Sequence, residues 1–133
     1  MKNLVLDTHV FLWLLEGNPK LPGALREVID DPTSDLYLPV LVVAEMVDLI
    51  SKGRSPLSMS NLDIALHSDP RLSVVPMTEE IALSGVRFIA LPDIHDRCIV
   101  ATTAKLIETV PDAVLATGDR AIRSFAFVPT MWH

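Results

Sequence analysis

Residues 3–19, NLVLDTHVFLWLLEGNP, decide the fold of this chain. Residues 3–6 form a short apolar run, typical of a buried strand, and the run ends at Asp7. Residues 8–16 are predicted to form a helix directly after the strand, and the Gly-Asn-Pro sequence at 17–19 predicts its end. A buried strand that passes straight into a helix indicates the first half of a β-α-β unit.

The same alternation of strands and helices continues along the rest of the chain. Further strands are predicted at residues 35–38, 72–75, 113–116 and 127–128. Further helices are predicted at residues 21–29, 40–52, 60–67, 78–88, 96–108 and 119–124. This pattern predicts an α/β fold, with a central parallel sheet of about five strands covered by helices on both faces.

Length and composition predict a single domain over residues 1–133. Half of the residues are hydrophobic, which is enough for a chain of 133 residues to bury a core. Cys98 is the only cysteine, so an internal disulfide and a cysteine-based zinc site are excluded. The apolar run at residues 10–15 is too short for a secretory signal, and no run reaches the roughly 20 residues that span a bilayer. We therefore expect a cytoplasmic protein with no membrane partner.

The net charge of −6 opposes binding to nucleic acid, because phosphate groups repel an anionic protein. Bound divalent cations or a basic partner protein would reverse the sign of the charge locally. The eleven lysines and arginines are scattered, and Lys52 with Arg54 and Arg120 with Arg123 are the only close pairs. Charge alone leaves a nucleic-acid function open.

Two aspartates follow predicted strands. Asp7 comes directly after the first strand, and Asp119 lies just beyond the strand at 113–116, after Thr117 and Gly118. Open parallel sheets bind ligands at the carboxyl ends of their strands, so the fold is expected to bring these two carboxylates together. The alternative for each is an N-cap of the following helix, and for a lone aspartate in such a turn capping is the better explanation.

Glu45 is a third candidate because it borders the apolar stripe of the predicted helix at 40–52. The nearby Asp48 has Lys52 four residues further on, whereas Glu45 has no cation three or four residues away in either direction. A half-buried carboxylate is costly unless a cation meets it. A side chain that reaches solvent or bonds the backbone is an equal alternative for Glu45.

Asp93 and Asp96 lie three residues apart at the start of a predicted helix. One is expected to cap the helix while the other projects forward. Because residues 99–101 pack inward directly after Asp96, this residue is placed nearer the sheet edge and Asp93 in the loop. Physical reasoning from the residues leaves open which of the two is the main acid.

Carboxylates at these positions would repel one another if they converged, and a divalent cation would relieve the repulsion. Mg²⁺ or Mn²⁺ is predicted because the ligands are hard oxygens and no Cys-His pattern exists. Such ions promote hydrolysis of phosphodiester bonds. Whether one or two ions act stays open. The residues alone predict a metal-binding and catalytic set of Asp7, Glu45, Asp119 and one of Asp93 and Asp96.

Several stretches resemble the blocks of PIN-domain toxins of the VapC type. They are residues 6–13 (LDTHVFLW), 44–45 (AE), 93–102 (DIHDRCIVAT) and 115–120 (LATGDR). The order and spacing of these blocks extend over essentially the whole chain. The resemblance assigns the third acid to Asp96, which completes a predicted metal-binding and catalytic set of Asp7, Glu45, Asp96 and Asp119. His95 stands where relatives often carry an aromatic residue, and its role stays open.

The resemblance implies a three-layer α/β/α PIN fold and an Mg²⁺- or Mn²⁺-dependent endoribonuclease that is the toxin of a toxin–antitoxin pair. The implied partners are an RNA substrate, a small antitoxin that inhibits the enzyme, and a second copy in a homodimer. Thr8 and Thr117 would orient ligands or water, and Asp93 would be an auxiliary acid. Arg97, Arg120 and Lys52 are candidates for phosphate contacts, with an ordinary solvated surface as the alternative.

Three other functions are kept as alternatives. One is a non-catalytic PIN-fold binding module in which the acids only cap helices. Another is a stand-alone PIN nuclease without an antitoxin. The third is an enzyme or receiver that uses Asp7 as a phosphoryl acceptor, which would need a lysine at a later strand end, where residues 117–119 read TGD instead.

Overall fold

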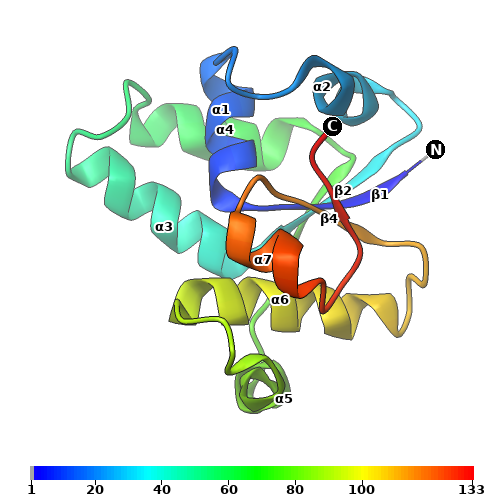
Figure 1. The fold of residues 1–133 in the computed structure, drawn as a ribbon. Coiled ribbons are helices and arrows are strands. Elements are labelled where there is room, and N and C mark those ends of the chain that lie inside the picture. The colour runs from blue at the N-terminus through cyan, green and yellow to red at the C-terminus, as the bar shows by residue number, and fades with distance from the viewer. Residues whose placement is uncertain (1) are drawn as a thin grey trace.

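The computed structural model describes residues 2–133 and contains a five-stranded parallel sheet (Figure 1). The strand order is β3-β2-β1-β4-β5, and every neighbouring pair is parallel. The strands are β1 (Asn3–Leu6), β2 (Asp35–Pro39), β3 (Leu72–Val75), β4 (Val114–Ala116) and β5 (Thr130–Met131). The predicted α/β class and parallel sheet are confirmed.

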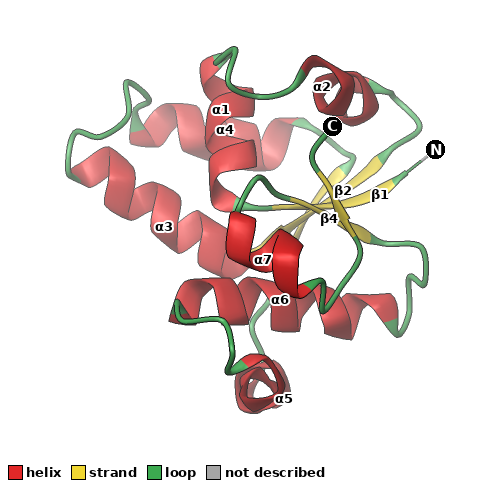
Figure 2. Ribbon diagram, in the orientation of Figure 1, coloured by secondary structure: helices red, strands yellow, loops and turns green. Residues whose placement is uncertain are grey.

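Helices connect the strands and cover both faces of the sheet (Figure 2). They are α1 (Thr8–Glu16), α2 (Gly23–Asp30), α3 (Val40–Ser51), α4 (Met59–Ser68), α5 (Glu79–Ser84), the 3₁₀ turn η1 (Gly85–Phe88), α6 (Ile94–Ile107) and α7 (Arg120–Phe125). Parallel crossovers are right-handed, so helices before and after the reversal of strand order lie on opposite faces. In Figure 1, α1, α2 and α4 lie above the sheet, and α5 and α6 lie below it. This is the expected three-layer α/β/α arrangement.

β1 lies in the middle of the sheet because its neighbours are β2 and β4. Leu4, Val5 and Leu6 have no exposed surface, which explains why this strand is an uninterrupted apolar run. The chain moves from β1 outward to β3 and then returns to β4, so strand order reverses between β1 and β4. Ligands in open α/β sheets bind outside the carboxyl ends at such a reversal. The fold therefore presents the residues after β1 and β4 to a common site.

The end of the first helix follows the predicted signal. Gly17 adopts a left-handed conformation with φ of 64°, and its N–H donates to carbonyls of the last turn of α1. A residue without a Cβ adopts this conformation at little cost, so glycine ends the helix cleanly. Within residues 2–133, no helix is both long and apolar enough to cross a membrane.

Two predicted elements differ from the structure. The last strand is Thr130–Met131 and not residues 127–128, which makes that prediction wrong. Pro129 uses its carbonyl to accept from Leu115 N–H, and pairing with β4 begins there. A proline is tolerated at the start of an edge strand, so it marks the beginning of the strand and not its end. The predicted helix at 78–88 is α5 followed by the 3₁₀ turn η1, and the change occurs at Gly85.

Candidate active site

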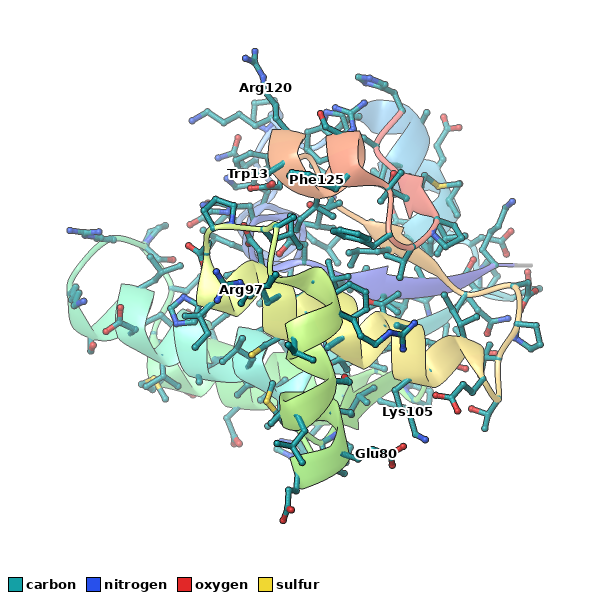
Figure 3. The ribbon with its side chains drawn as sticks, turned by 60° about the horizontal axis from the view of Figure 1, so that its bottom comes forward. Trp13, Glu80, Arg97, Lys105, Arg120 and Phe125 are labelled. Atoms are coloured by element: carbon teal, nitrogen blue, oxygen red, sulfur yellow. The ribbon has the colours of Figure 1, made fainter. Side chains whose placement is uncertain are left out.

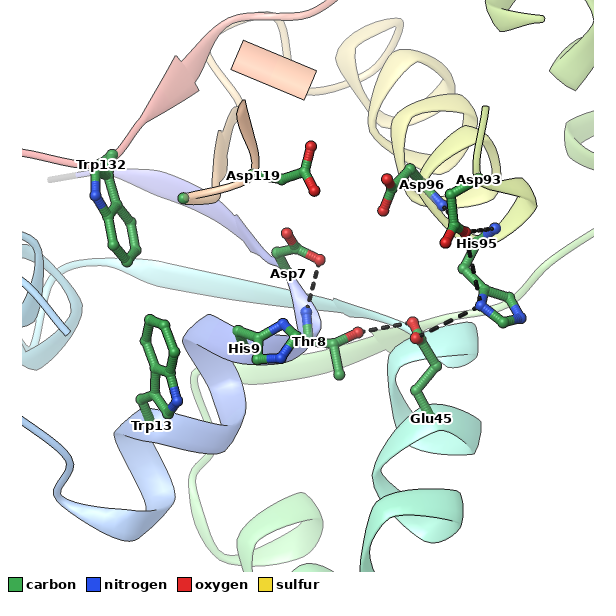
Figure 4. A pocket seen from close by; sticks show the side chains of 11 residues that line it. Asp7, Thr8, His9, Trp13, Glu45, Asp93, His95, Asp96, Asp119 and Trp132 are labelled. Carbon is green, nitrogen blue, oxygen red and sulfur yellow. Dashed lines mark hydrogen bonds and ion pairs between the residues drawn. The ribbon is translucent and has the colours of Figure 1, made fainter. Parts of the chain in front are cut away.

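The four predicted acids line one pocket at the carboxyl end of the sheet (Figure 4). The pocket has a volume of about 390 Å³. Asp7 follows β1, Glu45 comes from α3, Asp96 from the first turn of α6, and Asp119 from the loop after β4. Residues separated by more than a hundred positions are thus brought together by the strand order. The lining residues are Asp7, Thr8, His9, Trp13, Glu45, Asp93, His95, Asp96, Gly118, Asp119 and Trp132.

Asp7 is held by two hydrogen bonds in a buried position, only 7% exposed. Thr8 N–H donates to Oδ1 over 2.8 Å, and the hydroxyl of the fully buried Thr117 donates to Oδ2 over 2.5 Å. Burial raises the pKa of Asp7, while the hydrogen bonds from Thr117 and Thr8 oppose that rise. The carboxylate is therefore fixed in place with lone pairs left over on both oxygens.

Glu45 is tied to the start of α1. The hydroxyl of Thr8 donates to Glu45 Oε1 over 2.8 Å, and the side chain is 27% exposed. His95 Nδ1 lies 3.7 Å from Glu45 Oε2 and 3.7 Å from Asp93 Oδ1. The second oxygen of Glu45 therefore faces the pocket beside an imidazole ring. Thr8 and Thr117 each orient one of the predicted ligands.

Capping and pocket lining are not exclusive for these aspartates. Asp7 and Asp119 are the N-caps of α1 and α7, and Asp119 Oδ1 accepts from Ile122 N–H over 2.9 Å. Asp93 is the N-cap of α6 and accepts from the backbone N–H groups of His95 and Asp96. Asp96 itself is half-buried and projects into the pocket (Figure 4). One acid caps and the other projects forward, as their spacing predicted.

The electrostatics of the pocket favour binding of a cation. The pKa of Asp96 is raised to about 7 by burial and by the negative charges of Asp119, Asp93, Asp7 and Glu45. Among residues 2–133, neither a lysine nor an arginine lines this pocket. The phosphoryl-acceptor alternative therefore lacks the lysine that it would need in the pocket. With a pKa of about 7, Asp96 is only partly ionised at neutral pH, and a cation bound beside it would favour the ionised form.

The carboxylates line the same pocket but do not form a closed cluster. In the described part of the chain, no three His, Cys, Asp or Glu side chains are close enough together to hold a metal ion as they stand. The donor set still fits Mg²⁺ or Mn²⁺, because it consists of hard carboxylate oxygens. The raised pKa of Asp96 agrees with this, because a bound cation would offset the burial and the neighbouring negative charges that raise it.

The three basic residues named as phosphate contacts lie outside the pocket lining. Arg97 donates to the backbone carbonyls of Leu91 and Pro92, so its guanidinium braces the loop before α6. Lys52 pairs with Asp48 over 3.0 Å, as the spacing of four residues suggested. Arg120 is exposed at the start of α7 and projects outward (Figure 3). Phosphate binding by Arg97 or Lys52 would require these contacts to be exchanged.

Sequence reasoning missed the aromatic side of the pocket. His9, Trp13 and Trp132 line the pocket but are absent from the predicted site. His9 and Trp13 are four residues apart on one helix, so their shared face was detectable in the sequence. Trp132 gave no such signal, because its place depends on the pairing of β5 with β4.

Replacing Thr117 with valine is expected to lower the free energy of unfolding by about 1–3 kcal/mol. The Thr117 hydroxyl donates to Asp7 and accepts from Asp119 N–H over 3.1 Å, and valine provides neither contact. Thr117→Ser retains the hydroxyl and is the matched control. Urea denaturation of both variants measures the effect, and equal stability of the valine and serine variants would contradict this role.

Comparison with known proteins gives the family. The model of the PIN domain matches residues 4–128, so the chain belongs to the PIN domain family. A search of curated proteins found no match.

Solved structures agree on the fold. The chain is similar to a chain in the crystal structure of VapBC2 from Rickettsia felis bound to a DNA fragment from their promoter, with 16% identity and a TM-score of 0.71 over 97% of both chains. It is also similar to a chain in DNA-bound VapBC from Salmonella typhimurium, with 18% identity and a TM-score of 0.65 over 100% of both. At these identities the likeness establishes the fold.

Proposed function

We propose that this protein is an Mg²⁺- or Mn²⁺-dependent endoribonuclease and the toxin of a toxin–antitoxin pair. The observation that carries the proposal is the meeting of four acids from four elements in one pocket that no lysine or arginine of residues 2–133 lines. Membership of the PIN domain family supports a nuclease function for such a pocket. The fit of hard oxygen ligands to these ions supports the choice of metal.

Asp7, Glu45, Asp96 and Asp119 would hold the ion, and each would thereby serve catalysis. A bound divalent cation would supply Lewis-acid chemistry, in which water becomes a better nucleophile and charge on the phosphodiester is stabilised. Thr117 and Thr8 keep Asp7 and Glu45 in fixed orientations. Asp93 holds the first turn of α6 and thereby positions Asp96.

An antitoxin is proposed because the similar structures from Rickettsia felis and Salmonella typhimurium are VapBC complexes. A small antitoxin that inserts a basic side chain would match the acidic pocket and block the metal site. We also propose a homodimer in the cytoplasm. Exposed apolar side chains at Leu83, Val86, Ile89 and Ile94, each more than 60% exposed, support an interface between two copies.

Two alternatives make different predictions. A stand-alone PIN nuclease would cleave RNA but would bind no antitoxin encoded beside it. A non-catalytic PIN-fold module would neither require the ion nor lose a function when Asp7 becomes asparagine. The helix-capping bonds of Asp7 and Asp119 are the observation that favours this module, because they give both residues a structural role that needs no metal ion.

RNA cleavage by the purified protein tests the proposed activity. Mg²⁺ is expected to support cleavage that leaves 5′-phosphate ends, excess EDTA should stop it, and added Mn²⁺ should restore it. The ends are read by labelling with and without prior phosphatase treatment. Cleavage that continues at the same rate in excess EDTA would overturn the proposal.

A further inference from the structure

An aromatic wall borders the acidic pocket on the side of α1 and β5 (Figure 4). We define it as His9, Trp13 and Trp132. The ring centroids of His9 and Trp13 are 5.5 Å apart, and those of Trp13 and Trp132 are 6.1 Å apart. All three residues line the same pocket as the carboxylates. The proposed metal chemistry uses none of them.

The wall is anchored and close to the acids. Trp13 and Trp132 are half-buried and pack against the hydrophobic core, so a ligand would meet rings already held in place. A Cβ at Gly118 would lie only 2.8 Å from Cζ2 of Trp132, so glycine is what lets the indole reach the backbone there. Gly118 sits between Thr117, which donates to Asp7, and Asp119. A group packed on the wall is therefore beside the carboxylates.

We propose that the aromatic wall is a subsite on which an unpaired nucleobase packs next to the scissile phosphate. This inference rests on the proposed ribonuclease function. A nucleobase is flat and apolar on its faces and packs well on indole rings. In a duplex those faces are already stacked on neighbouring bases, so only a base outside a helix is free to use the wall.

The geometry gives the manner of binding. Favourable contact between two aromatic planes needs about 3.5 Å, so a base between Trp13 and Trp132 would need about 7 Å. Their 6.1 Å separation and 50° tilt leave no such slot, so the base packs on the pocket side of the wall. Lys20 Nζ lies 5.9 Å from the ring centroid of Trp13 and supplies a positive charge for a neighbouring phosphate.

The test measures binding in a protein that carries Asp96→Asn, so that the probes stay intact, with Mg²⁺ present. The probes are an oligoadenylate of about eight nucleotides, the same ribose-phosphate chain without bases, and an adenylate–uridylate duplex of equal length. We expect the oligoadenylate to bind about tenfold more tightly than the base-free chain. The duplex should lose that advantage.

In Trp132→Leu, the affinities for the oligoadenylate and for the base-free chain should be within about twofold of each other. Trp132→Phe should keep most of the preference for the oligoadenylate, because phenylalanine is still aromatic. Phe125→Leu is the matched control, because Phe125 is an exposed aromatic residue on α7 outside the pocket (Figure 3). Thermal unfolding checks that each variant is folded. If Trp132→Leu does not fold, Trp13→Leu and Trp132→Phe carry the comparison.

Equal affinity for the oligoadenylate and the base-free chain in the parent protein would overturn the inference. So would a preference that Trp132→Leu leaves unchanged. Cleavage of RNA by the wild-type chain is measured alongside, because it tests the proposed function by itself. If the protein cleaves RNA but binds both single-stranded probes equally, only the nucleobase subsite is rejected. If it prefers the oligoadenylate but does not cleave RNA, only the proposed nuclease function is rejected.

Discussion

Asp96→Asn is expected to lower the rate of RNA cleavage by about 10³-fold or more, since loss of a charged ligand removes several kcal/mol of stabilisation in the transition state. Asparagine keeps the size of the side chain and removes its charge. The negative charges of all the other carboxylates in the pocket raise the pKa of Asp96, so a cation bound among these carboxylates would lie close to Asp96. Single-turnover cleavage in Mg²⁺ measures the effect.

Asp63→Asn is the control, because Asp63 is exposed on α4 and pairs only with His67 among the ion pairs of residues 2–133. It should cleave at the wild-type rate. A cleavage rate for Asp96→Asn within about tenfold of wild type would contradict the role of Asp96, since a tenfold change corresponds to only about 1.4 kcal/mol.

Asp96→Asn should also stabilise the metal-free protein at alkaline pH. The pKa of Asp96 rises from 3.8 to about 7 on folding, so the folded state resists ionisation of this group. The penalty is absent below pH 3.8, grows as pH rises, and is complete above about pH 7. Without solvent screening, this penalty would lower the free energy of unfolding by about 4 kcal/mol. Screening by solvent reduces the penalty to about 1–2 kcal/mol. Urea denaturation in EDTA at pH 5 and 8 measures it, and an equal difference between variant and wild type at both values would contradict the assignment.

Leu6→Ala is expected to lower the free energy of unfolding by about 2–5 kcal/mol. Leu6 is completely buried at the carboxyl end of β1, the central strand, and it pairs with Ala116 of β4. A cavity there removes packing directly beneath Asp7, because Asp7 N–H donates to the Ala116 carbonyl in the same ladder. The loss is a large share of the stability of a domain of this size.

Ile64→Ala provides the matched comparison, since Ile64 on α4 is 59% exposed and lies outside the proposed dimer interface. It should change stability by less than about 0.5 kcal/mol. Chemical denaturation of both variants in EDTA separates packing from metal binding. Similar losses for Leu6→Ala and Ile64→Ala would show that β1 is not the centre of the core.

The fold was predictable because β1 is a continuous apolar run and the end of α1 is marked by glycine and proline. Residues 4–6 are completely buried, and strands that are covered on both faces have continuous apolar sequences. The last strand was predicted at residues 127–128 but lies at Thr130–Met131, because its position is set by pairing with β4, which is distant in sequence. Short edge strands carry too few residues to have a period of their own.

The positions of the acids were predictable to different degrees. Asp7 and Asp119 follow from strand ends, and the prediction that they share a pocket is confirmed. Glu45 was found from its isolation beside an apolar stripe, but its bond to Thr8 requires the packing of α3 against α1. Trp132 could not be placed beside Gly118 from local sequence, because a tight contact of this kind appears only in three dimensions.

Titration of the metal-free protein with Mn²⁺ tests most directly whether these acids form a metal site. Isothermal calorimetry on the wild-type chain and on Asp7→Asn, with Asp63→Asn as control, gives the stoichiometry and affinity. We predict saturable binding by the wild type and the control, weakened by about 10- to 100-fold or lost in Asp7→Asn. Wild-type protein that binds no Mn²⁺, or an Asp7→Asn variant that binds it as tightly as the wild type, would contradict the proposed function.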